Sequence, residues 1–286
     1  MELSILLNYL LKKRGTAEHR SVRECAALCA NAGFRYVDYT PDFLREDYLD
    51  AAKRDLDTLS QSGITVEQAH APFNRYRAYK TEDFGRFFMR SFEAANAVGA
   101  KYMVVHADEY RTKDCYDAAQ AENEAYEFLA PFVEYAEKNG MIVAIENVFE
   151  DTAWPMFDGK SRFTSRVDEL IGIIERFHSA NVKCCWDFGH AKCAFGTEHM
   201  LDALKQASKY VCCTHVHDNY YGKDLHLLPF LGDIEWESHM KYLGEIAYAG
   251  KFSFEFVYGR IPDELLPMML NTAHSVGEYL LGLSKK

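Results

Sequence analysis

The chain has 286 residues, of which 48% are hydrophobic and 26% are charged, a balance typical of globular proteins. This composition excludes a disordered chain, a collagen-like chain and a small disulfide framework. The net charge of −11 argues against nucleic acids and anionic membranes as partners, because an acidic surface repels phosphate groups.

The sequence carries no sign of export. Lys12, Lys13 and Arg14 follow the first apolar stretch, whereas a signal peptide has its basic residues first. No apolar run reaches the roughly 18 residues of a membrane-spanning helix. The eight cysteines form no Cys-x-x-Cys pair. We therefore expect reduced thiols in a cytoplasmic protein.

Strand and helix patterns alternate along the whole chain. The predicted strands are Ser4–Asn8, Tyr36–Tyr39, Thr65–His70, Tyr102–His106, Ile142–Glu146, Lys183–Asp187, Val211–His217 and Phe252–Phe256. The predicted helices, each with apolar residues three and four apart, are Val22–Asn31, Tyr48–Gln61, Phe84–Ala97, Ala118–Lys138, Val167–Phe177, Met200–Lys209, Trp236–Ala249 and Glu264–Leu283.

Eight strand–helix units predict an α/β protein with a single (β/α)8 TIM barrel over residues 1–286. Strands that are apolar on both faces, as these are, are typical of a buried parallel sheet. A doubly wound open sheet is the alternative. No Gly-x-Gly-x-x-Gly motif follows the first strand, so a dinucleotide cofactor has no support. The longest irregular stretches, Phe149–Arg166 and Asn219–Glu235, both follow strands and would overhang the catalytic face.

Ionisable side chains collect where the predicted strands end, which is where such a barrel has its catalytic face. Six of the eleven histidines occupy strand ends or the loops directly after them, together with several carboxylates. In chain order these residues are His70, His106, Glu146, Asp187, His190, His215, His217, Asp224, His226 and Glu255.

Carboxylates that converge on one barrel mouth need a counter-charge, because burial of an unpaired carboxylate is costly. A divalent cation would supply that charge, and histidine with carboxylate ligands suits Mn, Co, Zn, Mg or Fe. The alternative is a solvated polar mouth with hydrogen-bonded His–carboxylate pairs. Five basic residues in the predicted loops are expected to be solvated surface charges rather than phosphate contacts: Lys113, Lys160, Arg162, Lys192 and Lys223.

Five motifs carry a resemblance to a known family. They are Glu146-Asn147, Asp187-Phe188-Gly189-His190, His215-Val216-His217-Asp218-Asn219, Asp224-x-His226 running into Gly232-Asp233-Ile234-Glu235-Trp236, and Glu255. In their order and strand placement they resemble the xylose-isomerase-like barrel superfamily, which includes sugar-phosphate isomerases and epimerases as well as endonuclease IV. The resemblance covers nearly the whole chain.

The two branches of this superfamily imply different metal sites. The isomerase and epimerase branch implies one ion held by Glu146, Asp187, His215 and Glu255. In this branch, His190 would contact the substrate or support a metal ligand. The same two roles are open to His217. The endonuclease branch implies a three-metal cluster that maps onto His70, His106, Glu146, Asp187, His190, His215, Asp224, His226 and Glu255.

The basic residues favour the first branch. Arg75, Arg77 and Lys80, with Tyr76 and Tyr79, form a single basic patch on an acidic chain, whereas duplex contacts usually need a broader positive surface.

We therefore expect a metal-dependent isomerase or epimerase for a sugar or sugar phosphate. In it a divalent ion (Mn, Co, Mg or Zn) stabilises an enediolate while Glu146 and Glu255 transfer protons. The alternatives are a polyol or inosose-type dehydratase, an endonuclease IV-like trinuclear zinc phosphodiesterase and a non-catalytic barrel. Homodimers and homotetramers are common among such barrels, so a homo-oligomer is one expectation.

Overall fold

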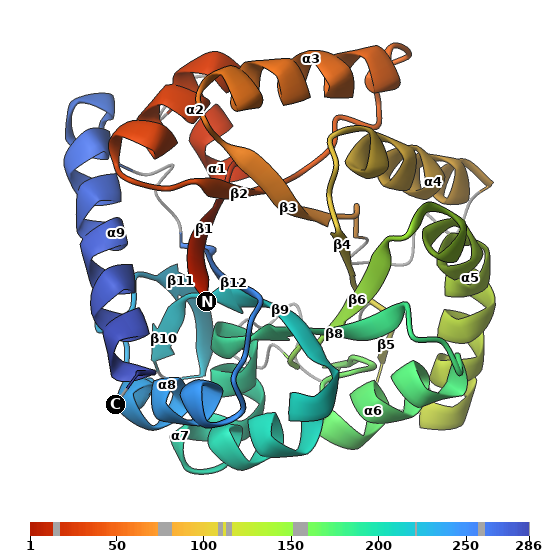
Figure 1. Cartoon of the computed structure of the whole chain (residues 1–286). Coiled ribbons are helices and arrows are strands. Elements are labelled where there is room, and N and C mark those ends of the chain that lie inside the picture. Colours follow the sequence, from red (N-terminus) through yellow and green to blue (C-terminus); the bar gives the residue numbers. More distant parts are fainter. Residues whose placement is uncertain are drawn as a thin grey trace.

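The computed structural model describes residues 1–13, 18–73, 82–107, 111–112, 116–150, 160–220, 222–256 and 261–285. Eight parallel strands close into a barrel in the order β1-β12-β9-β8-β6-β4-β3-β2, and the main helices form a ring around it (Figure 1). The predicted (β/α)8 barrel is confirmed, and the open doubly wound sheet is excluded. No helix in the described part of the chain is long and apolar enough to cross a membrane.

The barrel strands lie within two residues of their predicted ends. They are β1 (Glu2–Leu6), β2 (Tyr36–Tyr39), β3 (Thr65–His70), β4 (Tyr102–Val105), β6 (Ile142–Glu146), β8 (Val182–Asp187), β9 (Val211–Val216) and β12 (Lys251–Phe254). The surrounding helices are α2 (Val22–Asn31), α3 (Tyr48–Gln61), α4 (Glu82–Ala97), α5 (Ala118–Asn139), α6 (Val167–Arg176), α7 (Phe188–Ala207), α8 (Trp236–Glu245) and α9 (Leu266–Leu283).

Local chemistry accounts for several helix ends. Ser21 and Glu24 form a reciprocal capping box at the start of α2, which satisfies backbone N–H groups that lack helical partners. Asp117 caps α5, and Gly140 ends that helix in the left-handed region at φ 68°. The turn at Gly140 leads the chain directly into β6, which begins at Ile142.

Helix α7 differs most from its prediction, because it begins at Phe188 and not near Met200. Asp187, the last residue of β8, accepts a hydrogen bond from the backbone N–H of His190 and caps the helix. Gly196, at φ 65° and ψ 173°, interrupts the helical geometry. The strand therefore passes directly into a helical turn that presents His190.

Several short elements were not predicted. Helix α1 (Asn8–Leu11) follows β1, and two single-turn 3-10 helices, η2 (Ser208–Tyr210) and η3 (Asp263–Leu265), precede β9 and α9. The stretch expected to be irregular after β9 contains an antiparallel hairpin of β10 (Asp218–Tyr220) and β11 (Lys223–Leu227). The stretch after β6 contains β7 (Lys160–Ser161), which pairs with β5 (Arg111–Thr112).

The core has an outer and an inner part. The outer part lies between strands and helices and includes Phe88, Phe92 and Phe252. The inner part fills the barrel with Tyr102, Val104, Ala144, Cys185 and Cys213. These inner side chains form the packed base beneath the carboxyl ends of the strands.

Candidate metal and active site

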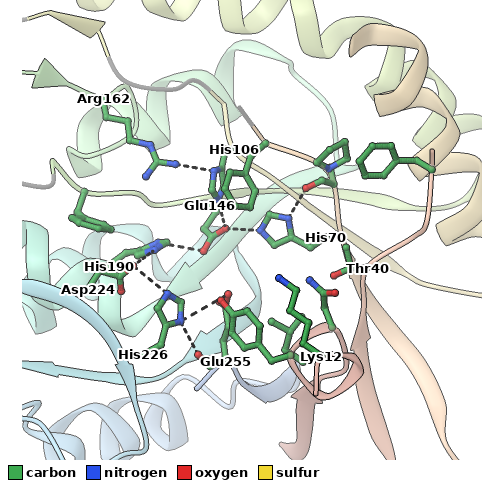
Figure 2. Close-up of a pocket in the computed structure, with 18 residues that line it drawn as sticks. Lys12, Thr40, His70, His106, Glu146, Arg162, His190, Asp224, His226 and Glu255 are labelled. Atoms are coloured by element: carbon green, nitrogen blue, oxygen red, sulfur yellow. Dashed lines mark hydrogen bonds and ion pairs between the residues drawn. The ribbon is translucent and has the colours of Figure 1, made fainter. Parts of the chain in front are cut away.

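A cavity of about 430 Å³ lies among residues at the carboxyl ends of the barrel strands (Figure 2). Its ionisable lining residues are Lys12, His70, His106, Glu146, Arg162, His190, Asp224, His226 and Glu255. Aromatic side chains, among them Tyr9, Phe73 and Phe149, add an apolar wall. The cavity thus combines a polar base with an apolar wall, which suits a small polar ligand.

Glu146 is the centre of this polar base. It is the last residue of β6, is 1% exposed, and has four histidine rings next to its carboxylate. Its Oε2 lies 3.3 Å from Nε2 of His70 and 3.1 Å from Nε2 of His106. Its Oε1 lies 3.0 Å from Nδ1 of His215 and 3.3 Å from Nδ1 of His190. Burial alone would raise the pKa of Glu146, but these imidazoles hold it well below its usual range.

The four residues predicted to hold one ion are brought together, with donor atoms within 4.8 Å of one another. Nδ1 of His215 lies at their centre, 3.0 Å from Glu146, 3.2 Å from Glu255 and 3.8 Å from Asp187. Three carboxylates around one buried nitrogen require positive charge. Either a proton on His215 or a divalent cation among the four donors meets that requirement.

Two further donor groups adjoin the first. One consists of His190, His217, Asp224 and His226, and the other of His70 with Glu146 and His215. Of the ten predicted site residues, His106 alone joins no donor group found in the described part of the chain. Instead, Nη2 of Arg162 donates to Nδ1 of His106 at 2.8 Å.

The β10–β11 hairpin supplies Asp224 and His226, which no barrel strand carries. His226 has φ 47°, a left-handed conformation that side chains other than glycine adopt rarely. Its ring stacks on His217 with centroids 4.0 Å apart, and its Nε2 lies 3.1 Å from Asp224 Oδ2. Burial alone would lower the pKa of His226, but Asp224 raises it to about 10.

Three histidines are anchored in the same way. His70, His190 and His226 each direct Nδ1 at a backbone carbonyl oxygen, at 2.7, 3.0 and 2.7 Å respectively. Because a carbonyl can only accept, Nδ1 carries the hydrogen and Nε2 is left toward the cavity. Metal-binding histidines are usually anchored like this, so the donor chemistry fits a divalent cation.

Asp38 belongs to the site although sequence reasoning did not select it. Its Oδ2 lies 2.9 Å from Nε2 of His215 and accepts a hydrogen bond from Nε2 of Gln68 at 2.6 Å. Asp38 lies next to the last residue of β2, so the strand-end criterion would have found it.

The prediction that Arg162 and Lys192 are solvated surface charges is wrong, because these residues are only 4% and 7% exposed. Lys223 is exposed, as expected.

Some predicted features lie outside the described residues. They are the basic patch of Arg75, Arg77 and Lys80 with Tyr76 and Tyr79, together with Lys113 and the side chain of Lys160.

Comparison with known proteins places the chain in a family. It is 25% identical to an uncharacterised protein of Sinorhizobium fredii in an alignment 264 residues long that covers 82% of this chain and 80% of that protein. Its fold is similar to the solved structure of a D-tagatose 3-epimerase-like protein (TM-score 0.75, 20% identity, 99% and 98% of the two chains). It is also similar to that of an L-ribulose 3-epimerase (TM-score 0.77, 15% identity, 100% and 96%). Residues 26–271 match the xylose isomerase-like TIM barrel family, to which this chain therefore belongs.

Proposed function

We propose that the protein is a divalent-metal-dependent isomerase or epimerase of a sugar or sugar phosphate. The observation that carries this proposal is a pair of carboxylates that line one cavity: Glu146 at the end of β6 and Glu255 directly after β12. Their donor atoms lie within 4.8 Å of each other. The structural similarity to an L-ribulose 3-epimerase supports the same class of substrate.

Glu146, Asp187, His215 and Glu255 would hold the cation, since three carboxylates with one imidazole suit Mn, Co or Mg. The cation would supply positive charge that polarises a substrate carbonyl and orients the neighbouring hydroxyl. The anchored ring of His190, at the edge of the cavity beside Phe149, would orient a substrate oxygen.

The two glutamates would transfer the protons. The lowered pKa of Glu146 keeps it unprotonated at neutral pH, so it can accept the proton from the carbon next to the carbonyl. Glu255 would return a proton to the substrate, and exchange with solvent would then reset both carboxyl groups. Return to the opposite face of the same carbon gives epimerisation, whereas return to the neighbouring carbon gives isomerisation.

Solvent deuterium tests this proposal. The purified protein with Mn²⁺, Co²⁺ or Mg²⁺ is incubated in D₂O with a panel of ketoses and ketose phosphates, and incorporation at carbon is followed by NMR. We expect Glu146→Gln and Glu255→Gln each to lower incorporation about 10²–10⁴-fold. Glu67→Gln, on β3 but outside the cavity lining, is the matched control. Unchanged incorporation in Glu146→Gln, or none by the unaltered protein on any substrate, would contradict the proposal.

A trinuclear phosphodiesterase is the second candidate, because the second donor group could hold a further ion. His106 counts against it. With Arg162 donating to its Nδ1, the neutral ring has its hydrogen on Nε2 and donates to Glu146. Elemental analysis without chelators separates the two candidates. About one Mn, Co or Mg per chain favours the isomerase, whereas two or three Zn with cleavage of an abasic duplex favours the nuclease.

A further inference from the structure

The orientation of His215 is determined from across the barrel. Its Nδ1 faces the three carboxylates, while its Nε2 lies 2.9 Å from Oδ2 of Asp38. Asp38 is on β2 and His215 on β9, and in the barrel order β1 and β12 lie between these strands. The contact therefore passes through the barrel interior and is not one between neighbouring strands. Both side chains are completely or almost completely buried.

We propose that Asp38 is a positioning residue of the site. By accepting the Nε2 hydrogen of His215, it directs the Nδ1 lone pair to the place where Glu146, Asp187 and Glu255 converge. It thereby increases the affinity of these donors for a divalent cation. This inference rests on the proposed function, since it assigns Asp38 a part in binding the same cation.

When a cation rather than a second proton supplies the positive charge, His215 is a neutral imidazole with one hydrogen, on either Nδ1 or Nε2. Without Asp38, the hydrogen of His215 would be best placed on Nδ1, where it can be donated to Glu146 at 3.0 Å. That tautomer removes the lone pair that a cation needs. With Asp38 present, Nε2 has an acceptor of its own, and Nδ1 is left free for the cation. A carboxylate behind a histidine also makes the ring a stronger ligand.

The position of Asp38 is itself supported. Gln68 donates to Asp38 Oδ2 at 2.6 Å and reaches the backbone carbonyl of Thr214, beside His215, at 3.5 Å. Asp38 also differs from the anchors of His70, His190 and His226, which are backbone carbonyls. Because Asp38 is a side chain, a single substitution can remove this anchor.

Two measurements on Asp38→Asn and Asp38→Ala test the proposal. Asparagine keeps the shape and one acceptor oxygen, whereas alanine removes both oxygens. In metal-free protein labelled with ¹⁵N-histidine, we expect a slowly exchanging Nε2–H signal from His215, assigned with His215→Gln, that disappears in Asp38→Ala. In Mn²⁺ titrations, we expect the dissociation constant to rise about 10–100-fold, more for alanine than for asparagine. Ser4→Ala, a buried hydroxyl without a hydrogen-bond partner in the described structure, is the control and should change neither readout.

The outcomes separate the two proposals. If the unaltered protein binds no divalent cation, the proposed function fails, and the effect of Asp38 on cation affinity fails with it, whereas the Nε2–H signal still shows whether Asp38 holds the hydrogen of His215. A merely structural Asp38 would lower the melting temperature without weakening Mn²⁺ binding by the folded fraction. Mn²⁺ binding within twofold of the unaltered protein, or an unchanged His215 signal in Asp38→Ala, overturns the inference. Should the alanine variant not fold, Asp38→Asn still provides both readouts.

Discussion

Gly189 packs so closely against His217 that the site has no room for a side chain there. A Cβ at Gly189 would lie 1.9 Å from Cε1 and 2.1 Å from Nδ1 of His217, far inside contact distance. The ring cannot easily move aside. It is fully buried, it stacks on His226 at 4.0 Å, and its Nε2 lies 3.1 Å from Asp187. Gly189→Ala should therefore disturb both the interior and the second donor group.

The expected magnitude follows from this overlap. An extra methyl group forced into a well-packed interior costs about 1–3 kcal/mol. For domains of 150–250 residues, each kcal/mol shifts the melting temperature by about 2–4 °C, so we expect Gly189→Ala to melt about 2–12 °C lower.

The assay is a thermal melt followed by circular dichroism, with Gly172→Ala as the control. Gly172 is in α6, and the nearest atom to its added Cβ is 3.9 Å away. Alanine there should stabilise the protein by about 0.5–1 kcal/mol, because it restricts the unfolded chain. A Gly189→Ala protein that melts at or above the unaltered protein would refute the packing argument.

Two further predictions concern buried and half-buried groups away from the cavity. Burial raises the pKa of Cys25 to about 12 and raises the pKa of Cys29 further. Neither thiol should therefore react with iodoacetamide at about pH 8 until urea unfolds the protein. Modification of either thiol in the native protein would contradict this. Burial raises the pKa of Asp55 despite its hydrogen bond from Tyr39, so its ionised form costs stability above the unfolded pKa of 3.8. Asp55→Asn should thus melt at a higher temperature than the unaltered protein at about pH 7, and this gain should shrink as the pH falls through the pKa of Asp55 in the folded protein. A lower melting temperature at about pH 7 would count against this reasoning.

The barrel could be predicted because its signals are local. The run Val143-Ala144-Ile145 before Glu146 is apolar on both faces, and Gly140 ends the preceding helix. The grouping of Glu146, Asp187, His215 and Glu255 follows from the strand-end rule, because carboxyl ends of parallel strands meet at one mouth. Their roles as ligands and catalytic groups stay predictions.

What the sequence concealed depends on contacts between distant segments. Arg162 looked like a loop charge, and only the fold places it against His106, 56 residues earlier. The helical pattern after Asp187 is interrupted at Gly196, which hid the first turn of α7 although Asp187 is a good cap. The β10–β11 hairpin is short and polar, so periodicity could not reveal how it orients Asp224.

Pairing between the first and last strands of the barrel has a consequence for biosynthesis. β1 aligns with β12 in parallel, with Glu2 opposite Lys251, and Glu255 follows directly after β12. Before β12 emerges, a growing chain that already carries Glu146 and His215 can form only an open sheet, with β1 and β9 as its unpaired edges. Such closure between distant segments is slow. Glu255, the last of the four donors Glu146, Asp187, His215 and Glu255, therefore joins the site in the same late step that removes the exposed edges of the sheet.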